Sequence, residues 1–132
     1  MGAKSKKKKW KEMTKKQRKA AVKAEAKRIE KEIPYMWRDL AKQIAKYNLK
    51  NPKHKITDNF LIKLFKKAEE MEESDVRSFY FQHDIPEVGR RIQLRRVMGA
   101  DLYEKVLESG IEFRYFVYWY DWIATQRVYD LY

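Results

Sequence analysis

The sequence contains no cysteine among its 132 residues. Disulfide bonds and metal sites built from thiolates are therefore excluded. The absence of cysteine fits our expectation of an intracellular protein, cytoplasmic, nuclear or in a virion, that is not secreted. Only 4 Gly and 3 Pro are present, which argues against a loop-rich or disordered body. No apolar run approaches the ~18 residues of a membrane span, and no apolar stretch of the signal-peptide type follows the first charges, so a membrane partner is not expected.

Motifs for catalysis and metal binding are also missing. The two histidines, His54 and His83, stand in unrelated segments without HxxxH or HExxH spacing. No Gly-rich phosphate loop occurs, and the acidic residues within 69–73 are interpreted as a solvated helix end. We therefore expect a protein that is not an enzyme and that holds neither a metal nor a cofactor.

Positive charge is concentrated in the first quarter of the chain. Residues 1–33 contain 14 of the 31 Lys and Arg but only 4 of the 19 Asp and Glu, so they carry +10 of the total +12. A block of like charge this dense resists collapse on itself and is best neutralised by a polyanion. We therefore divide the chain into a basic arm with a protruding helix, residues 1–33, and a compact body, residues 34–132.

The basic arm is the first candidate binding site, for DNA or RNA. Its cations would neutralise phosphates without reading sequence, and an indole within the run could stack on a base. A solubilising tail, a nuclear-import signal and a contact with anionic lipid are the alternatives. In composition this segment resembles the arms of ribosomal and virion proteins in general. The candidate residues are Lys4, Lys6, Lys7, Lys8, Lys9, Trp10, Lys11, Lys15, Lys16, Arg18 and Lys19.

Hydrophobic periodicity predicts helices along most of the chain. Thr14 and Gln17 fit a capping box at the start of a first helix, and Pro34 ends that helix or opens the next one. The first helix has only a narrow apolar stripe, so we expect it to bury little and to protrude or lie along a partner. The stripe consists of Val22, Ala26, Ile29 and Ile33.

The body is expected to be a small, irregular, mainly α domain of five to seven helices behind the arm and its helix. The segment 48–55 is interpreted as a basic loop. The predicted helices span about 35–48, Thr57 or Asp58 to about Met71, Ser74 or Asp75 to about His83, Glu87 to Met98, Asp101 to Gly110, and 111–132.

The two short helices around Asp84-Ile85-Pro86 form a second candidate site. A helix, a three-residue turn and an arginine-bearing helix are typical of the helix-turn-helix, whose second helix enters a major groove. Arg91 and Arg95 lie close enough in helical angle to act together there. The turn lacks the usual Gly, however, and an ion pair between Glu87 and Arg91 is the structural alternative.

Aromatic residues gather at the C-terminus, where nine of the 19 occupy the last twenty positions. The length of 111–132 favours a helix, although the alternation of its first residues fits a strand. Aromatic side chains would surround such a helix almost completely. We expect either a core helix alone, or a core helix with some aromatic side chains exposed or docked on another protein chain. The candidate interface residues are Tyr115, Tyr118, Trp119 and Trp122.

These features favour a non-enzymatic component of a nucleoprotein assembly, ribosome-like or virion-like. Its arm would lie on the phosphate backbone of DNA or RNA, and its aromatic body would dock on protein. A viral structural protein, or an adaptor or inhibitor that binds a protein partner, is one alternative, and a helix-turn-helix-like DNA-binding regulator is another. The choice between DNA and RNA, the oligomeric state and the protein partners stay open.

Overall fold

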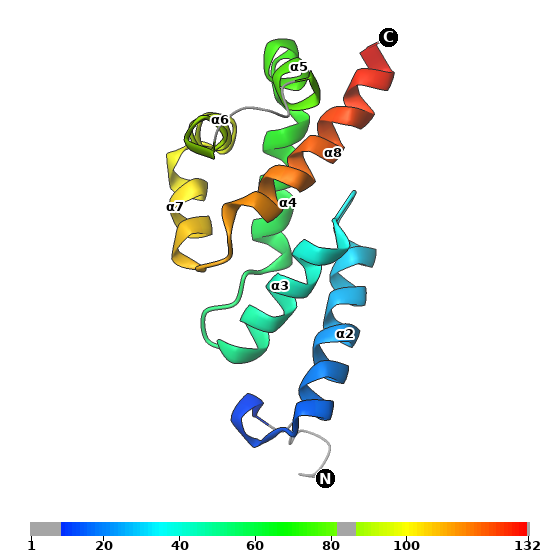
Figure 1. The fold of residues 1–132 in the computed structure, drawn as a ribbon, viewed down its shortest axis with the longest axis vertical. Helices are drawn as coiled ribbons and strands as arrows, with labels where there is room; N and C mark the ends of the chain where they lie inside the picture. Colours follow the sequence, from blue (N-terminus) through cyan, green and yellow to red (C-terminus); the bar gives the residue numbers. More distant parts are fainter. Residues whose placement is uncertain (1–8, 82–86, 132) are drawn as a thin grey trace.

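The computed structural model describes residues 9–81 and 87–131, which fold into one 3-10 turn and seven α-helices without a strand (Figure 1). The mainly α fold is confirmed, and the aromatic C-terminus is a helix. In these residues no helix combines the length and apolarity needed to cross a membrane. The elements are η1 (Trp10–Glu12), α2 (Lys15–Glu32), α3 (Arg38–Lys50), α4 (Asp58–Glu69), α5 (Glu73–Phe81), α6 (Glu87–Met98), α7 (Ala100–Glu108) and α8 (Phe113–Leu131).

Helix α2 begins with the predicted capping box. The Thr14 hydroxyl accepts from the Gln17 amide at 3.1 Å, and the Thr14 amide donates to the Gln17 side chain at 2.9 Å. These two bonds satisfy amides that have no partner inside the helix, so local sequence alone determines this start.

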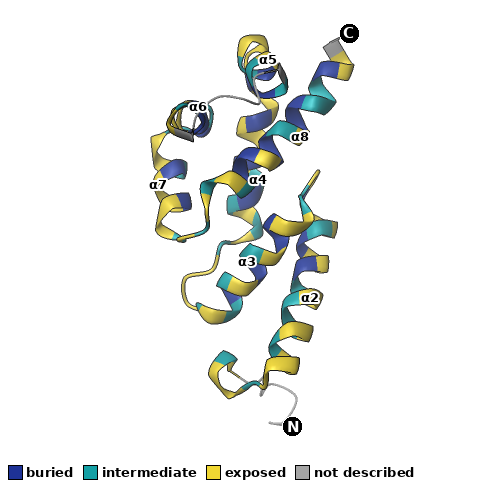
Figure 2. Cartoon of the chain, in the orientation of Figure 1, coloured by how far each residue is buried: buried dark blue, intermediate teal, exposed yellow. Residues whose placement is uncertain are grey.

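Helices α2 and α3 pack as a hairpin and run in opposite directions (Figure 1). Ala26, Ile29 and Ile33 are buried in the seam, whereas the first turns of α2 are mostly exposed (Figure 2). The expectation of little burial therefore applies only to the first half of α2, because the second half is part of the core.

The connection between α2 and α3 is held by the C-terminal helix. Tyr35 adopts the left-handed conformation with φ +55°, and its ring centroid lies 6.2 Å from that of Phe65. The Trp119 indole N–H donates to the carbonyl of Pro34 at 3.2 Å. Tyr35 lies in the connection between the two helices, and Trp37 is the N-cap of α3. Helix α3 therefore begins at Arg38 and not near residue 35.

Helix α8 is the central element, in contact with α3, α4, α5 and α6. The Tyr120 hydroxyl donates to the carbonyl of Leu64 in α4. Trp119 is fully buried, so the prediction that it lies at an interface with another chain was wrong. Its side chain is on the side of α8 that packs against the other helices. The buried residues of α8 are Phe116, Val117, Trp119, Tyr120, Ile123, Ala124 and Val128.

A largely buried ion pair joins α6 to α8. The guanidinium of Arg90 donates to both carboxylate oxygens of Asp121 at 3.3 Å, and Arg90 is 8% exposed. Gln93 accepts from Arg90 at 3.2 Å and donates to Ser78 of α5 at 2.6 Å. This network fixes three helices relative to one another, and it removes Arg90 from the surface of α6.

Several predicted boundaries differ from the structure. Gly99, with φ +88°, precedes α7 in place of Asp101, because the chain leaves α6 through a conformation that glycine adopts without strain. Helix α5 begins at Glu73, ahead of the predicted caps Ser74 and Asp75. Thr57 is confirmed as the cap of α4, since its hydroxyl accepts from the amide of Phe60.

The predicted basic loop is shorter than expected because α3 continues through Lys50. Asn48 is 4% exposed, and its side chain accepts from the Ile56 amide at 2.7 Å and donates to the Ile56 carbonyl at 2.9 Å. The side chain of Asn48 therefore belongs to the packed body and ties the loop back onto α3. The turn Asp84-Ile85-Pro86 lies outside the described residues.

Candidate nucleic-acid interface

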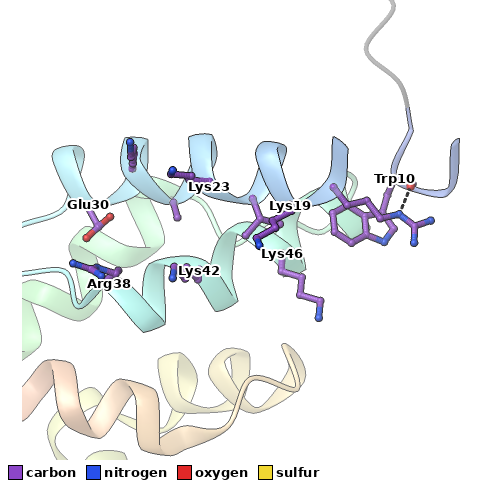
Figure 3. A pocket seen from close by; sticks show the side chains of 11 residues that line it. Trp10, Lys19, Lys23, Glu30, Arg38, Lys42 and Lys46 are labelled. Carbon is purple, nitrogen blue, oxygen red and sulfur yellow. Dashed lines mark hydrogen bonds between the residues drawn. The ribbon is translucent and has the colours of Figure 1, made fainter. Parts of the chain in front are cut away.

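A groove between α2 and α3 gathers half of the Lys and Arg side chains of residues 9–50 (Figure 3). Seven cationic side chains and one carboxylate line it, and Val22 and Ala26 contribute apolar surface. We call this set the basic groove. Its lining residues are Trp10, Arg18, Lys19, Val22, Lys23, Ala26, Lys27, Glu30, Arg38, Lys42 and Lys46.

Two rows of cations face each other across the basic groove. The row on α2 is Lys19, Lys23 and Lys27, and every step is four residues. Each such step advances about 6 Å along a helix and turns only about 40°, so the three side chains stay on one side.

The second row, Arg38, Lys42 and Lys46, has the same spacing on α3. Because the helices run in opposite directions, the first cation of the α2 row lies near the last cation of the α3 row. Lys19 is beside Lys46, and at the other end of the groove Glu30 is beside Arg38 (Figure 3). The hairpin therefore aligns two rows that the sequence presents in opposite order.

The six cations of these rows are exposed, and within residues 9–81 and 87–131 none of them forms an ion pair with a carboxylate. Arg28, on the same helix α2, shows the contrast. Its guanidinium donates to both oxygens of Asp58 at 2.8 and 3.2 Å and also pairs with Glu25, and these hydrogen bonds raise the pKa of Arg28. The groove thus concentrates charge that the described part of the protein does not neutralise.

Trp10 stands at the end of the basic groove where α2 begins and α3 ends (Figure 3). Its carbonyl accepts from the Arg18 guanidinium at 2.9 Å. The guanidinium carbon of Arg18 lies 5.1 Å from the centroid of the indole, and the Lys50 ammonium lies 5.7 Å from it. Trp10 in η1 therefore contacts both α2 and α3, and this part of the basic arm does not extend away from the body.

The predicted residues of the arm fall into three groups. Trp10, Arg18 and Lys19 line the basic groove. Lys9, Lys11, Lys15 and Lys16 are exposed and lie outside its lining. Lys4, Lys6, Lys7 and Lys8 lie outside the described residues.

Sequence reasoning missed five of the groove's cations, namely Lys23, Lys27, Arg38, Lys42 and Lys46. The signal was present, since cations recur every four residues from Lys15 to Lys31 and again from Arg38 to Lys50. The net charge of residues 34–132 is small because acidic residues elsewhere in the body offset the cations of α3. The charge count by segment therefore did not reveal the row on α3.

Arg91 and Arg95 of α6 are exposed and do not line the basic groove. The guanidinium of Arg91 lies 4.6 Å from the centroid of the Phe113 ring, and together they border a separate hollow with Arg114. On the same helix, Val88 and Ile92 are 69% and 61% exposed. This surface is therefore mixed, apolar and cationic.

An aromatic face of α8 remains uncovered in the described chain. Tyr118, Trp122 and Tyr129 are 46%, 50% and 70% exposed, and their spacing puts them on one side of the helix. Trp37 extends this face, with its ring centroid 5.0 Å from that of Tyr118 and 5.8 Å from that of the half-buried Tyr115. Of the four predicted interface residues, the structure exposes Tyr118 and Trp122 and only part of Tyr115.

Among the described residues, no three His, Asp or Glu side chains are arranged to hold a metal ion. Comparison with known proteins found no match, either to a family model, to a curated protein or to a solved structure.

Proposed function

We propose that this protein is a non-enzymatic, nucleic-acid-associated component of a nucleoprotein assembly, and that it binds the phosphate backbone of DNA or RNA in the basic groove. The supporting observation is the pair of facing cation rows, Lys19, Lys23 and Lys27 against Arg38, Lys42 and Lys46, without carboxylate partners in the described chain. Like charges that line one groove repel one another, and a bound polyanion would offset that repulsion. The lysines of the arm would add further phosphate contacts.

The chemistry of the two rows favours backbone contact over sequence reading. Five of the six side chains are lysines, whose ammonium groups act as point charges and do not form the bidentate pairs that read base edges. Phosphate contacts position a protein on nucleic acid but carry no sequence information. Six such contacts predict an affinity loss of about 10³-fold between 50 and 200 mM salt.

The body would dock on protein through the aromatic face of α8. Exposed Tyr and Trp side chains are the residues that most often anchor protein interfaces, and Tyr118 and Trp122 are half exposed on this face. Phosphate contacts would hold the protein on nucleic acid, and this face would select its place in the assembly. Such an assembly lies inside a cell or a virion.

Binding measured by fluorescence anisotropy tests the proposal. Labelled duplex DNA, single-stranded DNA and RNA would be titrated with the full chain between 50 and 200 mM salt. A triple variant, Lys19→Gln, Lys23→Gln and Lys42→Gln, should weaken binding at 50 mM salt by 10-fold or more. It should reduce the salt slope by about 3 for duplex DNA and by about 2 for single strands.

A matched control separates the groove from net charge. The variant Lys63→Gln, Lys66→Gln and Lys105→Gln also removes three exposed lysines, none of which lines the basic groove. Its salt slope should stay close to that of the unmodified chain. Equal losses in the two variants would show that the groove has no special role, and failure of the unmodified chain to bind any polyanion would refute the proposal.

A further inference from the structure

The shape of the basic groove limits which nucleic acid can enter it. Helices α2 and α3 are in direct contact, and packed helices have axes about 8–10 Å apart. We expect the space above their seam to fit one extended strand. A duplex is wider than this spacing, since its major groove alone is about 12 Å wide, and we expect it to contact the two rows less closely than a single strand does.

The indole at the end of the groove adds a second requirement. Trp10 is only partly buried and stands where a strand running between the cation rows would leave the groove (Figure 3). A cationic groove that ends on an aromatic ring is the arrangement by which proteins bind single strands, with phosphates on the cations and a base on the ring.

The contacts of Trp10 are compatible with this use. Arg18 and Lys50 lie over the ring at 5.1 and 5.7 Å, from α2 and α3 respectively. Stacking of a base is a stronger contact than an exposed cation over an indole. An incoming base would therefore replace one cation on the ring, and the displaced cation would be free to pair with the phosphate of that nucleotide.

We infer that the basic groove takes single-stranded nucleic acid in preference to duplex, and that Trp10 is the stacking platform for one base at its end. This inference rests on the proposed backbone binding in the same groove. It identifies the ligand class as a single strand of DNA or RNA, recognised by its charge and by one unpaired base.

The test compares three ligands with the same number of phosphates: a single strand of dT or rU, an abasic strand of the same length, and a duplex of half that length. The unmodified chain should bind the single strand more tightly than the abasic strand. Trp10→Ala should weaken single-strand binding by about 5- to 100-fold and change abasic and duplex binding by less than twofold. Trp10→Phe should retain most of the affinity, and dT and rU strands should behave alike.

Two controls make the result decisive. Tyr80→Ala removes a partly buried aromatic side chain from α5, a helix that contributes no residue to the groove lining, and should leave all three affinities unchanged. Circular dichroism and thermal unfolding check that Trp10→Ala remains folded, which we expect because Trp10 is not part of the core.

The outcomes separate this inference from the function on which it rests. If Trp10→Ala weakened abasic and single strands equally, the indole would only position Arg18, and the inference would be wrong while backbone binding stood. An unmodified chain that preferred duplex would also overturn it. If no ligand bound with a salt slope that depends on the groove lysines, the proposed function would fail as well.

Discussion

The indole N–H of Trp119 donates to the carbonyl of Pro34 across 85 residues of sequence, at a distance of 3.2 Å. This bond connects the buried face of α8 to the turn that sets how α2 and α3 meet. The geometry of the basic groove therefore depends on a helix that contributes no residue to its lining.

Trp119→Ala should lower the free energy of unfolding by about 3–5 kcal/mol, because it empties a fully buried ring site and removes the donor to Pro34. Trp119→Phe should cost less, since most of the ring contact remains. Trp122→Ala, on the exposed side of the same helix, should cost about 1 kcal/mol or less. Urea unfolding measures all three, and similar costs for the two tryptophans would contradict the packing described above.

Breaking the Arg90–Asp121 pair should destabilise the protein strongly. Asp121→Ala leaves a guanidinium that is 8% exposed without its carboxylate, and we expect a loss of about 3 kcal/mol or more. Replacing both residues, Arg90→Met with Asp121→Leu, should recover most of that loss, because no buried charge remains.

The surface pair Arg77–Glu73 is the matched control for this prediction. Both side chains are about half exposed, so Arg77→Ala should cost less than about 1 kcal/mol. Chemical denaturation curves give the comparison. A double replacement that is no better than Asp121→Ala would show that the site needs the charge pair itself.

Alkaline pH should destabilise the protein through Tyr120. Burial raises the pKa of Tyr120 above its usual value of 10.0, so the folded state keeps this hydroxyl neutral while the unfolded state ionises. The ionisation of this group therefore leaves the free energy of unfolding unaffected below about pH 10. Above that value the free energy of unfolding should fall by about 1.4 kcal/mol per pH unit because of Tyr120.

Tyr120→Phe separates this effect from the titration of the other tyrosines and the lysines. The variant should lose about 1 kcal/mol near neutral pH, because the hydrogen bond to the Leu64 carbonyl is gone. In thermal unfolding, the difference in stability between the variant and the unmodified protein should shrink and change sign between pH 10 and 11.5. Parallel curves for the two proteins over that range would mean that Tyr120 ionises in the folded state.

Reversing one charge in the basic groove should raise stability while it weakens binding. Lys42→Glu places a carboxylate across the groove from Lys23, so that opposite charges replace like charges there (Figure 3). We expect a gain of about 0.3–1 kcal/mol at 20 mM salt that disappears at 1 M salt, where the Debye length is about 3 Å. Polyanion affinity should fall by 10-fold or more. A variant that is destabilised at low salt would show that the rows do not repel each other.

The extent to which sequence predicts this structure differs between its parts. The capping box of Thr14 and Gln17 and the cap at Thr57 were predictable because each is made within four residues of chain. The start of α7 was not, because it follows the left-handed conformation of Gly99, with φ +88°, and Asp101 lies inside the first turn.

The sequence by itself determined the helical class, the caps at Thr14 and Thr57 and the four-residue repeat of cations, since periodicity and capping act between near neighbours. It left the aromatic C-terminus open between a helix and a strand. Only the tertiary structure decided that Trp119 is buried while Trp122 is exposed, because both are tryptophans on one helix and differ only in what covers them. It also placed the cations of α3 opposite those of α2. That juxtaposition depends on the register and direction of two packed helices, which are set by the seam at Ala26, Ile29 and Ile33 and by the turn that Trp119 holds.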